Sequence, residues 1–406
     1  MNASAPVVRH GAFYQSLLTA LLSLNFGLVL FDRNATGFLM PFIQPELGLD
    51  NSQVGMLSSA LSLTWAVSAF GIGLIANRFS RKTLLVLTSL AFSLCSVMSG
   101  LAGSFMMLFA TRLLMGLAEG GIMPVSQAMI HTEISPLHRG LAMGVAQGFG
   151  SSLMGSFVAP VVLVAFATAL GWRNAFFLTA LPGLVTVALM AALIKPPLAA
   201  PVQQVQTQRM AWSVLFGNRN IVLCVLIGIL LVSYLVVCWA FMPLYLTQVS
   251  GYDAETMGWL MGALGISATI ASTAIPAWSD RIGRRWPMIV LPAIGMILPL
   301  AALYYSGSTW SLAALFAIGW AVTGVFPLFM ATIPSESISE SHVAAALGLC
   351  MGSSEILGGV LSPTIAGIAA DKFGLQAPLW MLFLFSLVAG VLALGIRETA
   401  PKKLAQ

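Results

Sequence analysis

Charged residues are scarce in this chain of 406 residues, of which only 8% are Asp, Glu, Lys or Arg. An ordinary soluble domain carries about a quarter. So few charges cannot cover the surface of a water-soluble fold of this size, and 58% of the residues are hydrophobic. The scarcity excludes an ordinary soluble protein and indicates that most of the surface faces lipid.

Cysteine and histidine are also scarce, with four of each. The cysteines lie inside apolar runs, at Cys95, Cys224, Cys238 and Cys350. None has the spacing of a metal site or of a disulfide framework, so we expect small core residues, and no metal and no cofactor. No nucleophile–base pair or nucleotide loop is present, so we do not predict an enzyme. The net charge of +5 comes from short basic loops between apolar runs and does not predict nucleic-acid binding.

What the chain has instead is long apolar runs. A bilayer core takes about 20 apolar residues per helix. The first run lacks a cleavage site, so we expect a retained membrane helix. We predict an all-α membrane protein with twelve transmembrane helices, near 15–43, 53–76, 83–103, 105–130, 140–168, 174–194, 219–248, 256–278, 287–306, 310–333, 343–369 and 377–396.

The basic residues of the loops predict the orientation. Of the 18 Lys and Arg, fourteen fall on the side that holds both termini, against Arg173 and Lys372 on the other side. The positive-inside rule then places both termini in the cytoplasm. The long polar loop 195–218 is rich in Pro and Gln, so we predict a cytoplasmic linker between an N-terminal bundle, 1–194, and a C-terminal bundle with a short tail, 219–406.

Landmarks recur at a constant offset of 203 residues. The basic loop motif at 77–82 matches the one at 280–285, and three further pairs have the same offset: Pro124 and Pro327, Glu133 and Glu336, Pro160 and Pro363. A duplicated unit of this kind predicts two pseudo-symmetric six-helix bundles around a central substrate path.

The basic loop motifs occur in both halves, so we assign them to the shared scaffold and not to the substrate. Cytoplasmic basic residues can cap helix C-termini and pair with acids at a neighbouring helix end. We predict a conformational latch formed by Asn77, Arg78, Arg81, Asp280, Arg281, Arg284 and Arg285.

These two motifs, together with Arg112-x-x-x-Gly116-x-x-x-Gly120, resemble the hallmarks of the major facilitator superfamily over nearly the whole chain. Within the superfamily, Phe31-Asp32-Arg33-Asn34 and the stretch 112–120 resemble the anion:cation symporter family. The resemblance implies import of a small organic anion with protons, by a monomer in the bacterial inner membrane. Asn77 stands where the first motif usually has Asp, which weakens the expected latch.

Four charged residues of the N-terminal half fall inside predicted spans: Asp32, Arg33, Arg112 and Glu119. A charge at bilayer depth costs at least about 2.5–3.5 kcal/mol, so each should face a partner or an aqueous cavity. We assign Arg33 to the substrate carboxylate, which a guanidinium binds through two hydrogen bonds. We assign Asp32 to pairing with Arg112 and to accepting a proton, and Glu119 to a second proton site. The resemblance supports these roles.

Structural alternatives stay open for the same residues. Arg112 could bond only to helix carbonyls, Asp32 and Arg33 could form a structural ion pair, and Glu119 could be a protonated interface acid. In the C-terminal half, Glu355 could be a proton site, a partner for Arg33 or a packing residue of a small-residue pattern.

Further candidates complete the predicted pocket. Substrate-binding residues are expected at Asn34, Gln147, Tyr234 and Ser354. Most of the tryptophans are expected to be interface anchors or packing residues, with cavity lining as the alternative for Trp239 and Trp320. Asn and Gln inside spans lie nearly all in the N-terminal half. That uneven distribution favours a small or partly apolar carboxylate over a polyol acid.

Two other functions fit part of the pattern. A proton-driven exporter of drugs or organic cations would use Glu119 and Glu355 as cation sites, but Arg33 would then repel its substrate. A membrane sensor would call for a sizeable cytoplasmic loop or tail, and the predicted loops are short.

Overall fold

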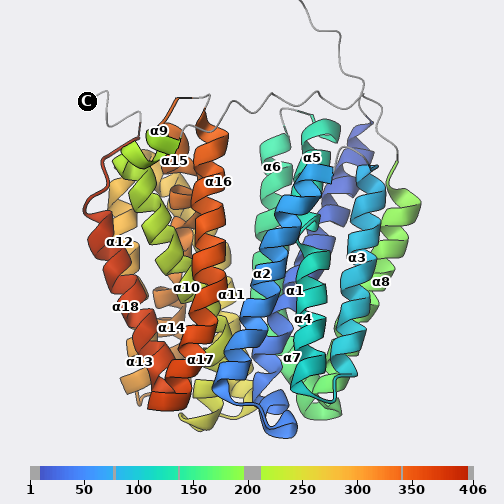
Figure 1. Ribbon diagram of the computed structural model, residues 1–406, viewed down its shortest axis with the longest axis vertical. Helices are drawn as coiled ribbons and strands as arrows, with labels where there is room; N and C mark the ends of the chain where they lie inside the picture. The colour runs from blue at the N-terminus through green and yellow to red at the C-terminus, as the bar shows by residue number, and fades with distance from the viewer. Residues whose placement is uncertain (1–9, 76–78, 136–137, 196–211, 340–341, 401–406) are drawn as a thin grey trace, which may run out of the picture.

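The computed structural model describes residues 10–75, 79–135, 138–195, 212–339 and 342–400. In these residues every regular element is a helix, and no strand occurs. The helices form two groups that stand side by side, one from α1 to α8 and one from α9 to α18 (Figure 1).

The first group holds α1 (Ala12–Leu47), α2 (Asn51–Ile75), α3 (Arg81–Gly100), α4 (Phe105–Glu119), α5 (Ile122–Glu133), α6 (Arg139–Met143), the π-helix η1 (Gly144–Val158), α7 (Ala159–Leu170) and α8 (Trp172–Leu193).

The second group holds α9 (Trp212–Gly217), α10 (Arg219–Gln248), α11 (Ala254–Ile282), α12 (Arg285–Gly295), α13 (Ile297–Tyr304), α14 (Thr309–Trp320), η2 (Ala321–Val325), η3 (Leu328–Thr332), α15 (Ile333–Glu336), α16 (Val343–Ser353), η5 (Ser354–Leu361), α17 (Ser362–Phe373) and α18 (Gln376–Ala393).

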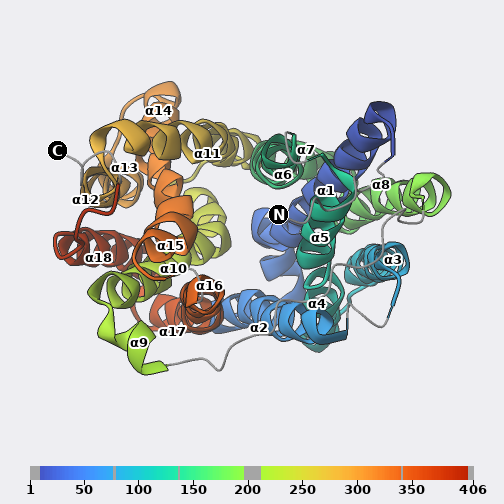
Figure 2. The same ribbon diagram turned by 90° about the horizontal axis from the view of Figure 1, so that it is seen from above.

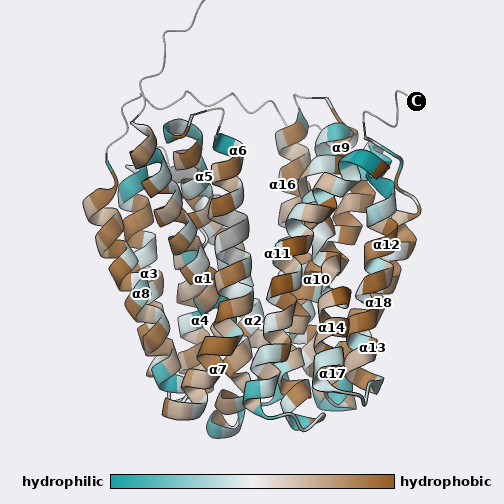
Figure 3. Ribbon diagram, turned by 180° about the vertical axis from the view of Figure 1, so that it is seen from behind, coloured by the Kyte–Doolittle hydropathy of each residue, from teal (hydrophilic) through white to brown (hydrophobic). Residues whose placement is uncertain are grey.

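Eleven helical stretches in the described part of the chain are long and apolar enough to cross a membrane. The predicted span 219–248 coincides with α10, and the other boundaries differ by a few residues. Hydrophobic residues predominate along the middle of the helices, and hydrophilic residues are more frequent toward the helix ends (Figure 3). The chain therefore has the pattern of a multi-pass membrane protein.

Three predicted spans contain π-helical segments, η1, η3 and η5, which the apolar pattern alone does not reveal. Of the pair η1 and η5, η1 ends at Val158 and η5 ends at Leu361, again 203 residues apart. Each precedes a proline, Pro160 or Pro363, in the first turn of the following α-helix. Because proline has no N–H to donate, the preceding turn loses an i→i−4 hydrogen bond, and the wider π geometry occurs there in both halves.

Two seams join the groups (Figure 2). In one, α11 packs against η1 and α7, and in the other, α17 and η5 pack against α2. Backbones also come very close where the two groups meet, between α1 and α10 and between α2 and α17. A Cβ added to Gly37 of α1 would lie 2.4 Å from the carbonyl oxygen of Trp239 in α10, and one added to Gly55 would lie 2.1 Å from that of Pro363. Glycine is required because no side chain fits in so small a gap.

Polar contacts between the groups gather at one end of the molecule. The amide of Gln248 donates to that of Gln44 at 2.8 Å, and the hydroxyls of Ser59 and Thr364 lie 2.8 Å apart. The carboxylate of Asp371 accepts from the start of α2. We call this region, residues 44–59 with 248 and 364–371, the closed end.

Candidate functional site

A cavity of about 430 Å³ lies between the two groups of helices, and both contribute to its wall. Its charged lining residues are Arg33 from α1, Arg112 from α4 and Glu355 from η5. Most of the remaining wall is apolar or aromatic, including Phe26, Trp65, Trp239, Trp320 and Phe326. Trp239 and Trp320 thus line the cavity, which was the alternative to the packing role favoured for most tryptophans. Such a cavity suits a small ligand with one charged end and an apolar body.

The guanidinium of Arg33 faces this cavity. It lies 5.2 Å from the centre of the Trp65 ring, close enough for a cation–π contact. None of the ion pairs between described residues involves Arg33. Its charge acts on two acids from opposite halves, Glu119 and Glu355. A free, half-buried guanidinium between two acids is suited to bind an entering anion.

Asp32, the preceding residue, points into the N-terminal group of helices and is fully buried. Successive residues of an α-helix point about 100° apart, so α1 sends these neighbours to different surroundings. One carboxylate oxygen accepts hydrogen bonds from Ser96 at 2.8 Å and Thr179 at 2.7 Å. The other has no partner among the described residues.

Arg112 is also buried, at 1% exposure. It donates to the hydroxyl of Ser99 at 2.5 Å and lies 5.5 Å from the centre of the Phe176 ring. The direct ion pair expected between Arg112 and Asp32 is not formed: no ion pair within 4.0 Å joins them. Instead, Asp32 accepts from hydroxyl groups of α3 and α8, and Arg112 donates to a hydroxyl group of α3.

Glu119 lies at the end of α4, seven residues after Arg112 and therefore on nearly the same face of the helix. It is 1% exposed, and neither carboxylate oxygen has a hydrogen-bond partner among the described residues. Asp32, Arg33 and Arg112 all act on it electrostatically. Glu119 therefore lies within electrostatic range of Asp32, Arg33 and Arg112.

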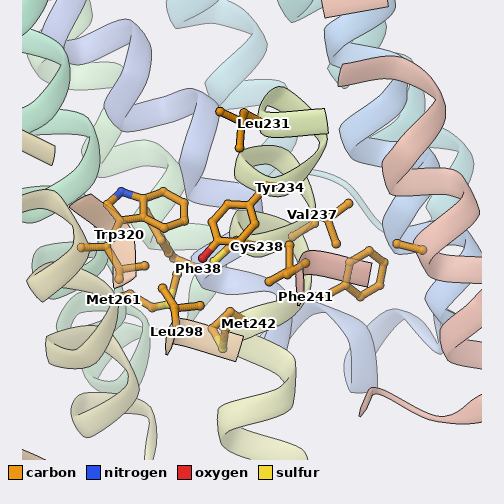
Figure 4. Close-up of a cluster of buried hydrophobic side chains, with 14 of the residues drawn as sticks. Phe38, Leu231, Tyr234, Val237, Cys238, Phe241, Met242, Met261, Leu298 and Trp320 are labelled. Carbon is orange, nitrogen blue, oxygen red and sulfur yellow. The ribbon is translucent and has the colours of Figure 1, made fainter. Parts of the chain in front are cut away.

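Tyr234 and Ser354 do not reach the cavity, contrary to the prediction. The ring of Tyr234 packs 5.8 Å from that of Trp320, and its hydroxyl donates to the carbonyl of Gly295 at 2.8 Å (Figure 4). Ser354 is fully buried and donates to the carbonyl of Cys350 in its own helix. Tyr234 thus supports a cavity tryptophan from behind, and Ser354 fills the space beside Gly228.

The remaining predicted pocket residues differ in what they contact. Asn34 lines the cavity, and its amide donates to the carbonyl of Gly155 at 2.9 Å, which ties α1 to η1. The side chain of Gln147 lies outside the described part of the chain. Sequence reasoning missed Trp65, Ser96, Ser99 and Thr179. For the two serines a signal was present, because Ser89, Ser93, Ser96 and Ser99 recur at helical spacing along α3.

The predicted latch is partly visible at the end opposite the closed end. Arg284 donates to Glu336 at 2.9 Å and to Asp280 at 2.5 Å. Arg285 caps α18 through the carbonyl of Leu394. These contacts match the expected pairing with acids and helix ends.

Other latch residues behave differently. Arg81 donates to the carbonyl of Ala128 and the hydroxyl of Thr132, at 3.1 and 2.9 Å. Arg281 is exposed and takes no part in the network around Arg284. Asn77 and Arg78 lie outside the described residues.

Glu398 completes the network in the C-terminal half. Its carboxylate accepts hydrogen bonds from four backbone N–H groups: Arg284, Arg285, Thr399 and Ala400. Burial alone would raise the pKa of Glu398, but these hydrogen bonds together lower it below its ordinary value. The charged form of Glu398 therefore ties the chain after α18 to the start of α12.

Comparison with known proteins identifies the family. The profile of the Major Facilitator Superfamily matches residues 22–272 and 237–406. The chain belongs to the major facilitator superfamily. The similar proteins are transporters and not enzymes, so this chain is a membrane transporter of that superfamily.

Two curated relatives and one solved structure are similar over most of the chain. A probable 4-methylmuconolactone transporter of Cupriavidus pinatubonensis is 27% identical over 82% of this chain and 81% of its own. A probable sulfoacetate transporter of Cupriavidus necator is 24% identical over 88% of each chain. A bacterial homologue of the human lysosomal transporter Spinster, in an inward-facing and occupied conformation, superposes with a TM-score of 0.82 at 17% identity, over 95% of this chain and 97% of its own. This last likeness concerns the fold alone.

Proposed function

We propose that this transporter imports a small organic anion, a carboxylate, together with protons by alternating access, as in the anion:cation symporter family. One observation carries the proposal: the guanidinium of Arg33 faces the cavity without an ion-pair partner among the described residues. The two relatives, a probable 4-methylmuconolactone transporter and a probable sulfoacetate transporter, support a small organic anion as substrate.

The assigned roles follow from where each group lies. Arg33 receives the carboxylate through paired, charge-assisted hydrogen bonds, and the face of Trp65 holds the guanidinium in the cavity. The tryptophans at 239 and 320, whose rings are 5.1 Å apart, pack against the apolar part of the substrate. A small, partly apolar acid fits this wall better than a polyol acid, whose hydroxyls need many amide partners.

Proton coupling is competition for one guanidinium. With Asp32 and Glu119 ionised, their negative charges offset that of Arg33, and the anion binds weakly. Protonation of the acids leaves Arg33 to the substrate carboxylate, and the loaded cavity is then close to neutral. A neutral cavity is less costly to enclose within the membrane, so the two bundles close around it.

The topology belongs to the same proposal. The helix α2, 25 residues long, would be the twelfth span beside the eleven that meet the length and apolarity limits. Two six-helix bundles, 1–194 and 219–406, would be joined by the linker 195–218, with both termini in the cytoplasm of a bacterial cell and the protein a monomer in its inner membrane. The closed end is then periplasmic, and the structure is that of an inward-facing state.

Purified protein in liposomes that enclose a pH-sensitive dye tests the function. Benzoate, sulfoacetate and glucuronate are added outside to the parent, Arg33→Ala, Arg33→Lys and Arg281→Ala. We expect one class of anion to acidify the interior with the parent and Arg281→Ala, at least tenfold more slowly with Arg33→Lys, and not with Arg33→Ala. Lysine keeps the positive charge but cannot form the two parallel hydrogen bonds that a guanidinium makes to a carboxylate. Efflux of a lipophilic cation without any anion-driven acidification would replace the symporter by a drug exporter.

A further inference from the structure

Buried polar side chains without partners recur inside the N-terminal bundle, away from the cavity between the bundles. Three helices contribute them. In α1, both amide atoms of Asn25 lack a partner, in α3 the hydroxyl of Ser89, and in α5 the hydroxyl of Ser126. Asn25 and Ser89 are fully buried, and Ser126 is 6% exposed.

These side chains continue the charged cluster at a regular spacing. Asn25 lies seven residues before Asp32 on α1, and Ser89 lies seven residues before Ser96 on α3. Seven residues are nearly two turns, so each pair shares one helix face and is separated by about 10 Å along the axis. Ser96 donates to Asp32, which places the two helices in register. Asn25 and Ser89 therefore lie at one common level, about 10 Å from the level of Asp32.

The helix α4 lies beside α3 and contributes two charged residues between these levels. The chain of α4 runs opposite to that of α1, so the step from Arg112 to Glu119, about 10 Å, points in the same direction along the bundle as the step from Asp32 back to Asn25. Arg112 is bonded to Ser99, and Glu119 is within electrostatic range of Asp32. The order along the bundle is thus Arg112, then Asp32, then Glu119, then Asn25 and Ser89 together. We call these five residues the polar column and include in it Ser126 of α5, which follows Glu119 by seven residues in the chain.

The polar column is bounded at both ends. Arg112 belongs to the column and also lines the cavity, so it joins the two. At the other end, Leu18 and Leu22 precede Asn25 on α1, and Leu85 precedes Ser89 on α3; all three are fully buried in one apolar cluster. On these two helices, apolar side chains therefore lie between the column and the end of the bundle that holds the latch.

Buried donors and acceptors without protein partners are costly unless water or another ligand satisfies them. Buried waters typically make about three hydrogen bonds to such groups. The charged groups of the column are Asp32 from α1 and Arg112 and Glu119 from α4, and Arg33 lies on the cavity side of α1. We propose that the polar column holds a chain of water that carries protons between Asp32 and Glu119 and onward past Asn25, Ser89 and Ser126.

The inference rests on the proposed proton coupling and extends it. Protons would move within one bundle while the anion moves between the two bundles, and the two paths would meet at Arg33 and Arg112, which both line the cavity. Asn25 and Ser89 would be positioning residues for water and would not touch the substrate. The apolar cluster beyond them would keep the column from leaking protons while the bundles are at rest.

Three single substitutions separate this role from packing. Asn25→Leu and Ser89→Ala remove polar atoms of the column and keep similar volumes. Ser93→Ala is the matched control, because Ser93 lies one turn from Ser89, is also fully buried, and has its hydroxyl bonded to the carbonyl of Ser89. A dry column predicts that Asn25→Leu changes transport little and raises the thermal unfolding temperature, since an unsatisfied polar group is removed.

Water in the column is tested directly by radiolytic labelling, in which hydroxyl radicals form from bound water and oxidise adjacent sulfur. Cys95 lies within electrostatic range of Asp32, Arg112 and Glu119, and it packs with the buried Met115. We expect both to be labelled in the parent and in Ser93→Ala, and at least fivefold less in Asn25→Leu. Absence of labelling in the parent overturns the proposal, whatever the protein transports.

Proton movement is tested in liposomes with benzoate, sulfoacetate and glucuronate as probes. In Asn25→Leu and Ser89→Ala we expect anion exchange at equal pH to stay within twofold of the parent, and uptake driven by a pH gradient to fall about tenfold. Unchanged gradient-driven uptake in both variants overturns the relay. If the parent moves none of the probes, the proposed function fails, and the labelling still decides whether the column holds water.

Discussion

The carboxylate of Asp371, near the end of α17, accepts a hydrogen bond at 2.9 Å from the backbone N–H of Ser52, at the start of α2. The N–H of Asn51 donates to the same carboxylate, also at 2.9 Å. An acid from one bundle therefore caps a helix of the other bundle. The first N–H groups of a helix have no partner within the helix and favour a negative charge, so this contact stabilises the closed end.

Asp371→Asn should weaken the closed end. The amide keeps one acceptor oxygen but lacks the negative charge that the start of α2 favours, an interaction of about 0.3–1 kcal/mol, so the population open at this end should rise about two- to fivefold. Spin labels at Leu170→Cys and Phe373→Cys, one in each bundle, would report the change as a longer distance between the labels. Asp253→Asn is the control, because Asp253 caps α11 within its own bundle through the N–H of Thr256 at 2.6 Å. An equal change in both variants would contradict a role specific to the interface.

Gly37→Ala should act on another contact between the bundles, that of α1 with α10, through sterics. The added Cβ would lie 2.4 Å from the carbonyl oxygen of Trp239, a backbone atom that cannot rotate away. Overpacking of this kind costs about 1–3 kcal/mol, so we expect the same label pair to separate and transport to fall at least tenfold. Gly348→Ala in α16 meets nothing within 4 Å and should leave transport unchanged. Normal transport by Gly37→Ala would show that α1 and α10 can move apart to accommodate the added methyl group without loss of function.

Much of the fold was predictable because the bilayer imposes a simple rule on sequence. Long apolar runs located the helices, as at α10, and the offset of 203 residues related Arg81 to Arg284. The seams between the bundles were not predictable, because Asp371 and Ser52 are 319 residues apart and nothing local marks them as a pair.

The candidate site was predictable in its charges and less so in their partners. A charge inside an apolar run is visible in the sequence, and Arg33 and Glu355 do line the cavity. The direction of a polar but uncharged side chain is not visible. Serine in a helix readily bonds to the carbonyl four residues earlier, as Ser354 does, and Tyr234 finds a carbonyl on α12. Neither residue therefore needs the cavity to satisfy its hydroxyl.

Glu398→Gln should destabilise the latch region in a way that depends on pH. Hydrogen bonds from backbone N–H groups lower the pKa of Glu398 in the folded protein below its ordinary value of 4.5, against the opposing effect of burial. The charged form therefore contributes stability at pH values above about 4.5, and this contribution is lost as the pH falls through the lower folded pKa. We expect the variant to unfold at a lower temperature than the parent at pH 7, and the difference to shrink as the pH falls below 4.5. Glu255→Gln, at an exposed position, is the control, and a difference independent of pH would contradict the argument.

Glu355→Gln tests whether the C-terminal acid competes with the substrate for Arg33. Glu355 lines the cavity, and Arg33 is the charge that acts on it. Removing a nearby opposite charge should release about 1 kcal/mol of attraction at a partly hydrated site, so the apparent affinity for the anion should rise roughly fivefold near neutral pH. Because the competing group would no longer titrate, affinity should also depend less steeply on pH.

Anion binding measured by calorimetry at pH 6 and pH 8 tests both expectations, with Glu46→Gln as a control, since Glu46 pairs with Arg173 away from the cavity. If affinity instead falls in Glu355→Gln, the carboxyl group contacts the substrate directly, and the competition for the guanidinium is confined to Asp32 and Glu119 in the N-terminal bundle.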